Sequence, residues 1–256
     1  MADGRAKRSR PAAPSPAQSA PAAGQLAGRI ALITGASRGI GAAVAKRFAG
    51  EGAHVILAAR TVGGLEEVDD AIQAAGGQAT LVPVDITDFA KIDQMGAAIA
   101  QRFGRLDILV GNAGALGQLT PVGHIDPDDW DDVMRVNVTA NWRLIRCFDP
   151  LLRRSEAGRA IFVTSGVANG VFPYWGAYAT SKAALEMLAK VYAGEIAKTK
   201  VRVNLLDPGI VRTGMRAKAF PGEDPAKLAA PESVTDAFVH LASVECTFHG
   251  QVIRAY

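Results

Sequence analysis

A tyrosine and a lysine stand four residues apart in the run YATSK, at Tyr178 and Lys182. Because residues at i and i+4 project from one face of a helix, the two side chains can share one ligand. An ammonium about 4 Å from a phenol oxygen, at an effective dielectric of about 20, stabilises the phenolate by roughly 4 kcal/mol before desolvation is subtracted. We therefore expect Lys182 to lower the pKa of Tyr178, and Tyr178 to act as a general acid or base.

A glycine-rich turn, TGASRGIG, follows the first apolar run and leads into a helical stretch. Glycines at Gly35, Gly39 and Gly41 allow a close approach of ligand to backbone that a Cβ would obstruct. The helix that follows presents unpaired N–H groups and its positive dipole end, which favours a pyrophosphate. Taken alone, such a glycine cluster is also typical of a plain tight turn.

The second apolar run ends in Ala58, Ala59 and Arg60, without an acidic residue. An acid at this position binds the ribose 2′-hydroxyl of NAD, whereas a 2′-phosphate needs cations. Arg60 and Arg38, the latter inside the glycine turn, can clamp a phosphate through their planar guanidinium groups. The pair predicts NADP(H) in preference to NAD(H), with two solvated surface arginines as the alternative.

Short runs rich in Val, Ile and Leu alternate with longer amphipathic stretches, as in strands buried between two helix layers. We expect strands at residues 30–34, 55–59, 79–84, 106–110, 160–164, 201–206 and 251–253. We expect helices at residues 39–49, 65–75, 89–103, 130–152, 177–198 and 233–241. This order predicts an α/β fold with one doubly wound (Rossmann) parallel sheet of about seven strands in three layers, with ligands outside the carboxyl ends of the strands.

The composition fits one folded unit, since 256 residues with 49% hydrophobic content can bury a sizeable core. Arg5, Lys7, Arg8 and Arg10 against Asp3 account for the whole formal net charge of +3. The remaining body offers no bulk charge for nucleic acid or an anionic membrane. No apolar run approaches the ~20 residues that span a bilayer. We expect a cytoplasmic protein with a small diffusible substrate.

Residues 1–25 are rich in Ala, Pro and Ser, which predicts a disordered tail before a folded domain at 26–256. The prolines argue against the amphipathic helix of a transit peptide, so a solvated leader is favoured. The two cysteines, Cys147 and Cys246, form no CxxC pair and no cluster with metal-ligand spacing. They predict a reduced compartment and no metal, and leave a disulfide open.

The glycine turn and YATSK together resemble the short-chain dehydrogenase/reductase family, which carries T-G-x-x-x-G-x-G and Y-x-x-x-K. Three further stretches are similar: VDIT at 84–87, NAG at 112–114 and PGIVRT at 208–213. The resemblance runs from about residue 25 to residue 253. Gly111 stands where the family more often has Asn, at a cost of one side-chain hydrogen bond at most, and the family's frequent Gly-Gly pair after the last strand is missing.

The resemblance implies a catalytic set of Asn137, Ser165, Tyr178 and Lys182. Tyr178 would exchange a proton with the substrate, Ser165 would bind the substrate oxygen, and Asn137 would hold a water in the proton relay. Lys182 would also bind the nicotinamide ribose. The expected cofactor contacts are Gly35, Ser37, Arg38, Gly39, Ile40, Gly41, Arg60, Asp85, Ile86, Asn112, Ala113, Gly114, Tyr178, Lys182, Pro208, Gly209, Val211 and Thr213.

The activity implied is transfer of a hydride between NADP(H) and a carbonyl or secondary alcohol. Basic residues at Arg153, Arg154, Arg216 and Lys218 leave open a 3-oxoacyl thioester reductase that receives an acidic carrier protein. A cofactor-sensing binding protein without turnover is the alternative from another class, and the intact Ser, Tyr and Lys set disfavours it. The helices at 130–152 and 177–198 resemble the family's dimer-forming pair, so we expect a homodimer or homotetramer.

Substrate contacts are expected from the loops 115–129, 166–177 and 215–231. The second loop holds Phe172, Tyr174 and Trp175. Such aromatics favour an apolar or aromatic carbonyl compound, although packing against the scaffold explains them equally well. The third loop is predicted to be a lid that excludes water.

Overall fold

The computed structural model describes residues 24–255, so most of the tail predicted for residues 1–25 lies outside the described residues. Seven strands form one parallel sheet in the order β3-β2-β1-β4-β5-β6-β7. Their bounds are β1 (Ile30–Thr34), β2 (His54–Ala59), β3 (Gln78–Pro83), β4 (Ile108–Gly111), β5 (Arg159–Val163), β6 (Arg202–Asp207) and β7 (Val252–Arg254). The order reverses between β1 and β4, which confirms the predicted doubly wound sheet.

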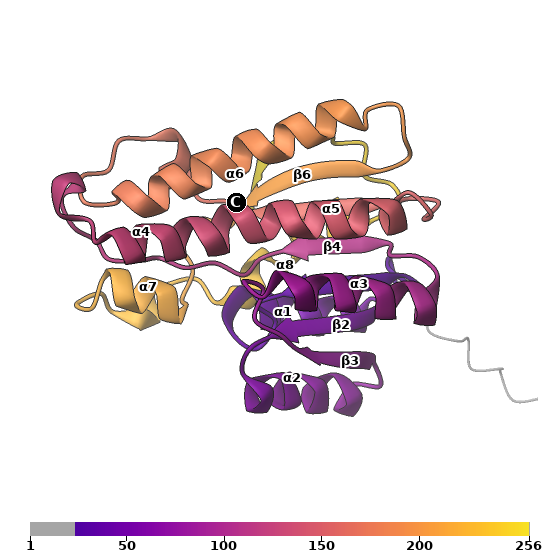
Figure 1. The fold of residues 1–256 in the computed structure, drawn as a ribbon. Coiled ribbons are helices and arrows are strands. Elements are labelled where there is room, and N and C mark those ends of the chain that lie inside the picture. The colour runs from indigo at the N-terminus through magenta and orange to yellow at the C-terminus, as the bar shows by residue number, and fades with distance from the viewer. Residues whose placement is uncertain (1–23, 256) are drawn as a thin grey trace, which may run out of the picture.

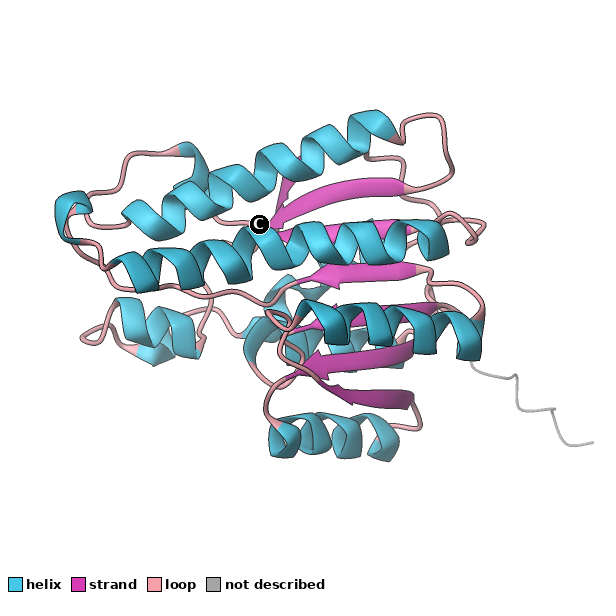
Figure 2. Ribbon diagram, viewed as in Figure 1, coloured by secondary structure: helices cyan, strands magenta, loops and turns pink. Residues whose placement is uncertain are grey.

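The helices cover both faces of the sheet. They are α1 (Gly39–Gly50), α2 (Val62–Ala74), α3 (Phe89–Phe103), α4 (Pro127–Met134), α5 (Ala140–Leu152), α6 (Gly176–Glu195), α7 (Gly214–Ala219) and α8 (Thr235–Ala242). Short 3-10 turns lie at η1 (Val122–His124), η3 (Gly166–Asn169), η4 (Pro225–Lys227) and η5 (Pro231–Val234). Helices α3, α5 and α6 lie in front of the sheet in Figure 1, and α1 and α8 lie behind it. The strand arrows of Figure 2 share one direction, so all carboxyl ends lie at one edge.

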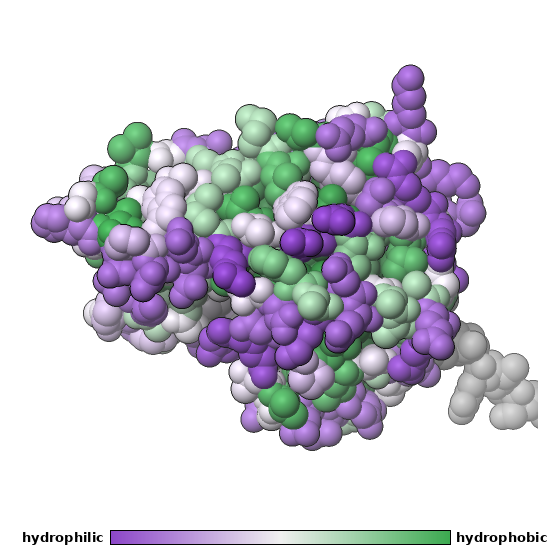
Figure 3. Space-filling view, viewed as in Figure 1, coloured by the Kyte–Doolittle hydropathy of each residue, from purple (hydrophilic) through white to green (hydrophobic). Residues whose placement is uncertain are grey.

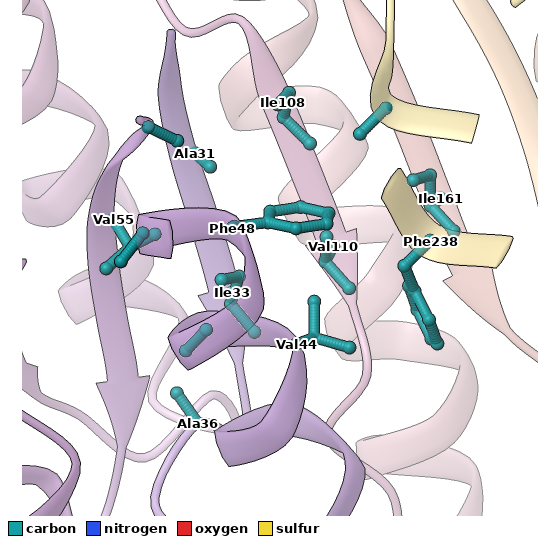
Figure 4. Close-up of a cluster of buried hydrophobic side chains, with 14 of the residues drawn as sticks. Ala31, Ile33, Ala36, Val44, Phe48, Val55, Ile108, Val110, Ile161 and Phe238 are labelled. Atoms are coloured by element: carbon teal, nitrogen blue, oxygen red, sulfur yellow. The ribbon is translucent and has the colours of Figure 1, made fainter. Parts of the chain in front are cut away.

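Two apolar cores result, one on each face of the sheet. Figure 4 shows Phe48 of α1 and Phe238 of α8 packed near Ile33 and Val110 of the sheet. Leu32, the neighbour of Ile33, belongs to the opposite core with α3, α5 and α6. Successive strand side chains point to opposite faces, so burial on both faces requires the uninterrupted apolar runs of the sequence.

The predicted helix at 130–152 differs most from the structure. It begins earlier, at Pro127, where the Asp126 carboxylate accepts a hydrogen bond from the Asp128 backbone N–H at 2.9 Å. It is then interrupted by a π-helical turn, η2 (Arg135–Thr139), between α4 and α5. The π-turn spans only five residues, which are too few for a change of period to be recognised in the apolar pattern. Such turns are frequent at functional sites, and this one contains Asn137.

Buried cations fasten the chain at the amino edge of the sheet. Arg29 donates to the backbone carbonyls of Asp107, at 3.0 Å, and of Ala242. Arg159 donates to the carbonyl of Ser243 at 2.9 Å. Burial lowers the pKa of Arg29 to about 10, although the negative charge of Asp107 acts to raise it. The loop after α8 is thereby tied to the starts of β1 and β5.

Cys147 and Cys246 are free thiols on opposite faces of the sheet, which rules out the disulfide that the sequence left open. Among residues 24–255, no helix has the length and apolar character needed to cross a bilayer.

Candidate functional site

Thr34 joins the carboxyl ends of β1 and β4. Its hydroxyl donates to the Val110 carbonyl at 3.2 Å and accepts from the backbone N–H groups of Asn112, at 3.0 Å, and Ala113, at 3.1 Å. The Asn112 amide donates in turn to the Thr34 carbonyl at 2.9 Å. These bonds bring the glycine turn and the NAG stretch together at the switch point of the sheet. Thr34 was missing from the predicted site, although it opens the glycine motif.

The glycine turn forms a cradle without side chains. Gly35 has φ +65°, and a Cβ there would lie 2.9 Å from the Asn112 amide nitrogen; a Cβ on Gly41 would overlap the carbonyl of Gly35. No described side chain caps the N-terminus of α1, and its first turn holds no acidic residue. The first N–H groups of α1 are therefore available to an anion, and the cradle fits a dinucleotide pyrophosphate.

The two predicted phosphate-binding arginines lie beside this cradle. Arg38 is the exposed N-cap residue of α1. Arg60 follows β2 with 74% of its side chain exposed, and its Nη1 lies 3.8 Å from the carboxylate of Asp85. Burial would raise the pKa of Asp85, but hydrogen bonds from the backbone and hydroxyl of Thr87, with Arg60 and Arg135 nearby, hold it below its usual value. An open pocket of about 620 Å³ adjoins this position, lined by Asp85, Thr87, Asp88, Phe89, Ala90 and Arg135.

Ser165 and Tyr178 meet beyond the carboxyl end of β5. The Ser165 side chain lies close enough to the phenol to influence its pKa, and the Tyr178 side chain is buried. Burial raises the pKa of Tyr178 to about 12, the nearby Ser165 side chain acts in the opposite direction, and the charge of Asp207 adds to the rise. At neutral pH the phenol therefore keeps its proton.

Lys182 lies one helical turn beyond Tyr178 and is also buried. Its ammonium donates to the Val163 carbonyl at 2.8 Å and lies 5.6 Å from the centroid of the Tyr178 ring. Burial lowers the pKa of Lys182 to about 8. The pKa of Tyr178 is thus not lowered as expected, because desolvation of the buried phenolate dominates.

Asn137 holds the π-turn against α6. Its amide nitrogen donates to the Ser181 hydroxyl at 2.9 Å and to the Ala115 carbonyl at 2.8 Å, and its amide oxygen accepts from the Ala115 N–H at 2.8 Å. Ser181 donates to the Tyr178 carbonyl at 2.7 Å. Both side-chain atoms of Asn137 are therefore engaged with protein.

Gly114 is the place where the NAG stretch meets two of the residues predicted to be catalytic. A Cβ on Gly114 would lie 3.3 Å from Asn137 Oδ1 and 3.6 Å from Lys182 Nζ. From the other side, a Cβ on Gly39 would lie 3.5 Å from the methyl group of Thr213, which caps α7 by accepting from the Arg216 N–H at 3.2 Å. The PGIVRT stretch therefore reaches over the glycine turn, and the predicted motifs share one edge of the sheet.

Glu186 is a buried residue of this site that the sequence reasoning missed. Its carboxylate accepts from the Thr164 hydroxyl at 2.8 Å and from the Asn169 amide at 3.1 Å, and pairs with Lys190 at 3.4 Å. Thr164 and Asn169 stand on either side of Ser165 along the chain. The signal in the sequence was an acid one helical turn beyond Lys182, on the same helix face.

The family model for short chain dehydrogenase matches residues 29–224. The chain belongs to the short-chain dehydrogenase family. It is 40% identical over 216 residues to the uncharacterized oxidoreductase YciK of Escherichia coli K12, covering 83% of this chain and 85% of YciK. A short chain dehydrogenase structure from Pseudomonas syringae matches with a TM-score of 0.89 at 39% identity, over 91% of this chain and 97% of that one. One from Escherichia coli CFT073, complexed with NADPH, matches with a TM-score of 0.86 at 38% identity, over 92% and 99%.

This short-chain dehydrogenase has a structural reason for Gly111. A Cβ at this position would lie 2.6 Å from the ring of Phe162 and overlap the side-chain oxygen of Asn141. Asn141, whose amide donates to the Asn137 carbonyl at 2.8 Å, thus occupies the space that a residue 111 side chain would need. Replacing the family's Asn by Gly111 therefore does more than remove one hydrogen bond, because it leaves room for the Asn141 side chain.

The basic residues behind the thioester alternative do not gather at the site of this dehydrogenase. Arg153 and Arg154 follow α5, at the amino edge of the sheet, where Arg154 donates to the Gly104 carbonyl at 3.2 Å. Arg216 lies on α7 but is paired with Glu223 through two contacts of 2.6 Å. The observed arrangement offers no cluster of these residues to an acidic carrier protein.

Proposed function

We propose that this chain is an NADP(H)-dependent oxidoreductase that transfers a hydride between the nicotinamide and the carbon of a carbonyl or secondary alcohol. The observation that carries the proposal is that Ser165, at the carboxyl end of β5, lies beside buried Tyr178, with buried Lys182 one turn further along α6. These groups lie at the same sheet edge as the uncapped N-terminus of α1. Few arrangements other than acid/base chemistry on a bound dinucleotide require both features side by side.

The cofactor assignment rests on the cradle and on the exposed arginines. The α1 N-terminus with Gly35 would hold the pyrophosphate, and Arg38 with Arg60 the 2′-phosphate. Bound NADP(H) supplies or accepts the hydride at its nicotinamide ring. The NADPH complex of the Escherichia coli CFT073 relative supports the same choice. The remaining contacts are proposed at Ser37, Gly39, Ile40, Gly41, Asp85, Ile86, Asn112, Ala113, Gly114, Pro208, Gly209, Val211 and Thr213.

In the direction of reduction, Tyr178 donates its proton to the substrate oxygen. The raised pKa keeps the phenol protonated at neutral pH, which suits a donor. The Ser165 hydroxyl binds the same oxygen and stabilises its developing negative charge. The ammonium of Lys182 then stabilises the phenolate that remains. Oxidation of an alcohol reverses each step, and Asn137 fixes the helix that carries Tyr178.

Exchange of Tyr178 for Phe tests the proposal. We expect Tyr178→Phe to lower kcat by about 10²- to 10⁴-fold, the usual worth of a general acid, with the Kd for NADPH almost unchanged. Tyr192→Phe is the matched control, since Tyr192 is a buried tyrosine of the same helix whose hydroxyl donates to Asp149 instead, at 2.7 Å. Normal turnover by Tyr178→Phe would refute the assignment of Tyr178 as the general acid. NADPH binding by the wild type without turnover of any carbonyl or alcohol would favour the sensor alternative.

We also infer a homodimer or homotetramer that forms through α5 and α6. Trp142 on α5 and Met187 and Val191 on α6 are exposed large apolar side chains, and Figure 3 shows apolar patches along this face. Exposed apolar surface of this kind is typical of protein contacts. Sedimentation of the wild type beside Met187→Glu measures the state, and an unchanged mass in the variant counts against this face.

A further inference from the structure

The wall of the site next to Tyr178 is a stack of rings. Trp175 meets the Tyr178 ring edge to face, with 5.9 Å between centroids, and Phe220 at the end of α7 lies 5.8 Å from Trp175. The guanidinium of Arg216 covers the Phe220 ring at 3.8 Å and is fixed by its double contact with Glu223. The two rings are therefore held beside the residue that is proposed to exchange the proton.

An apolar rim surrounds this wall. The loop before α6 reads VFPYW at 171–175, with no charged residue; Val171 is 96% exposed and Tyr174 59% exposed. Val122 of η1 is 72% exposed, and the Thr120 N–H donates to the Tyr174 carbonyl at 3.0 Å, which ties the two loops together. Figure 3 shows apolar side chains at the end of the molecule that carries these loops.

The backbone of the rim is held in an unusual conformation. Tyr174 has φ +75° and is the one non-glycine residue of the described chain in the left-handed region. A bulky side chain is rarely found there, and such positions persist where the surroundings determine them, often at ligand sites. The exposed ring of Tyr174 gains little from the core. Its conformation therefore points to a use outside the fold.

We propose that the substrate of this site is an uncharged ketone or aldehyde with an aryl or alkyl group that packs on Trp175 and Phe220, with Val122 and Tyr174 at the rim. This inference rests on the proposed function. Aromatic rings supply large apolar contact areas at a fixed geometry, and exposed apolar surface marks ligand sites. The wall's own cation, Arg216, is already neutralised by Glu223, so it favours no anionic substrate. Because Trp175 contacts Tyr178, a group packed on this wall lies beside the residue proposed to exchange the proton, as a substrate must and another protein need not.

The test compares methyl ketones of increasing chain length with acetophenone and its 4-carboxylate. Each is measured as turnover with NADPH and as equilibrium binding by calorimetry with NADP⁺, which has no hydride to give. We expect binding and kcat/KM to improve by up to about fourfold per buried methylene, and the carboxylate to be disfavoured. A flat series, or a preference for the carboxylate, overturns the inference. Graded binding without turnover supports the apolar wall while contradicting the proposed function.

Two variants assign the effect to the wall. Phe220→Ala should weaken binding of acetophenone by about tenfold or more, the worth of a lost aromatic contact, and change acetone binding little. Val244→Ala is the control, an exposed apolar residue at the amino edge of the sheet. Equal losses for both ketones would mean that Phe220 only positions the loop. An altered oligomeric state with an unchanged ketone series would make the surface an interface between copies. Either result overturns the inference.

Discussion

The carboxylate of Glu186 accepts a hydrogen bond from the hydroxyl of Thr164 at 2.8 Å. Thr164 directly precedes Ser165, and Glu186 follows Lys182 by one turn of α6. The bond therefore locks the strand end that carries the serine to the helix that carries the tyrosine and lysine. The distance between Ser165 and Tyr178 depends on this buried contact as well as on the backbone of β5.

Glu186→Ala should uncouple the two elements. The variant leaves the buried Thr164 hydroxyl without its acceptor, at about 1–3 kcal/mol, and also releases the exposed Asn169 amide. We expect kcat to fall about tenfold or more while the KM for NADPH changes by less than about twofold, the pattern of an interaction that serves the reacting groups only. Steady-state kinetics measure both.

Glu195→Ala is the matched control for Glu186, since it removes an exposed carboxylate from the last turn of the same helix. Glu186→Gln, which retains an acceptor oxygen for Thr164, should recover part of the lost kcat. A loss of thermal stability in Glu186→Ala with unchanged kcat would assign the residue to folding alone.

Arg38→Ala and Arg60→Ala should discriminate between the two nicotinamide cofactors. Each arginine is expected to supply a charge-assisted hydrogen bond to a 2′-phosphate, so the KM for NADPH should rise about ten- to hundredfold in each variant. The KM for NADH should change by less than about threefold, since it has no phosphate at this position. Lys46→Ala, which removes an exposed cation from α1, is the control. Equal losses with both cofactors would refute the phosphate clamp.

The pH dependence of reduction should follow Lys182. Because burial lowers the pKa of Lys182 to about 8, the side chain is charged below that pH and neutral above it. Tyr178, with its pKa raised to about 12, keeps its proton throughout the range. We expect kcat/KM to be flat at lower pH and to fall about tenfold per pH unit above pH ~8, as the ammonium is lost. Initial rates at constant ionic strength measure this profile, and a rate that rises through pH ~8 would contradict it.

Arg29→Met should destabilise the fold without touching the site. It removes the buried donor to the backbone carbonyls of Asp107, Ala157 and Ala242, at about 1–3 kcal/mol for each carbonyl left unpaired, so the free energy of unfolding should fall by about 3 kcal/mol. Arg47→Met is the control, because the Arg47 ion pairs with Glu51 and Asp236 lie at the surface and contribute less than about 1 kcal/mol. Urea unfolding gives both values. Equal losses of unfolding free energy in the two variants would contradict the prediction that buried Arg29 stabilises the fold more than Arg47 does.

The order of the elements could be predicted because each strand is an apolar run buried on both faces, and each predicted strand overlaps an observed one. The motifs at the strand ends could be placed together for the same reason, since parallel strands end at one edge. Helix α7 was missed because six residues are too few for a helical period to emerge. The π-turn at Asn137 was missed because its five residues are too few for a change of period to be recognised.

Contacts between distant parts of the chain could not be derived from local patterns. Glu186 meets Thr164, and Asn141 occupies the space beside Gly111, only because α5 and α6 pack on the sheet in one particular register. The pKa of Tyr178 also depends on burial that residue spacing does not reveal. Spacing identified which side chains meet, whereas packing determines how strongly each is desolvated.

The hydrogen bonds of Arg29 to Ala242 and of Arg159 to Ser243 also bear on how the chain acquires its fold during synthesis. The two cations lie at the starts of the first and fifth strands, but their carbonyl partners leave the ribosome 213 and 84 residues later. Until then, closing the sheet would bury two guanidinium groups without these acceptors, which is costly. The nascent chain therefore has reason to stay open at the amino edge of the sheet until α8 and the loop after it supply these acceptors.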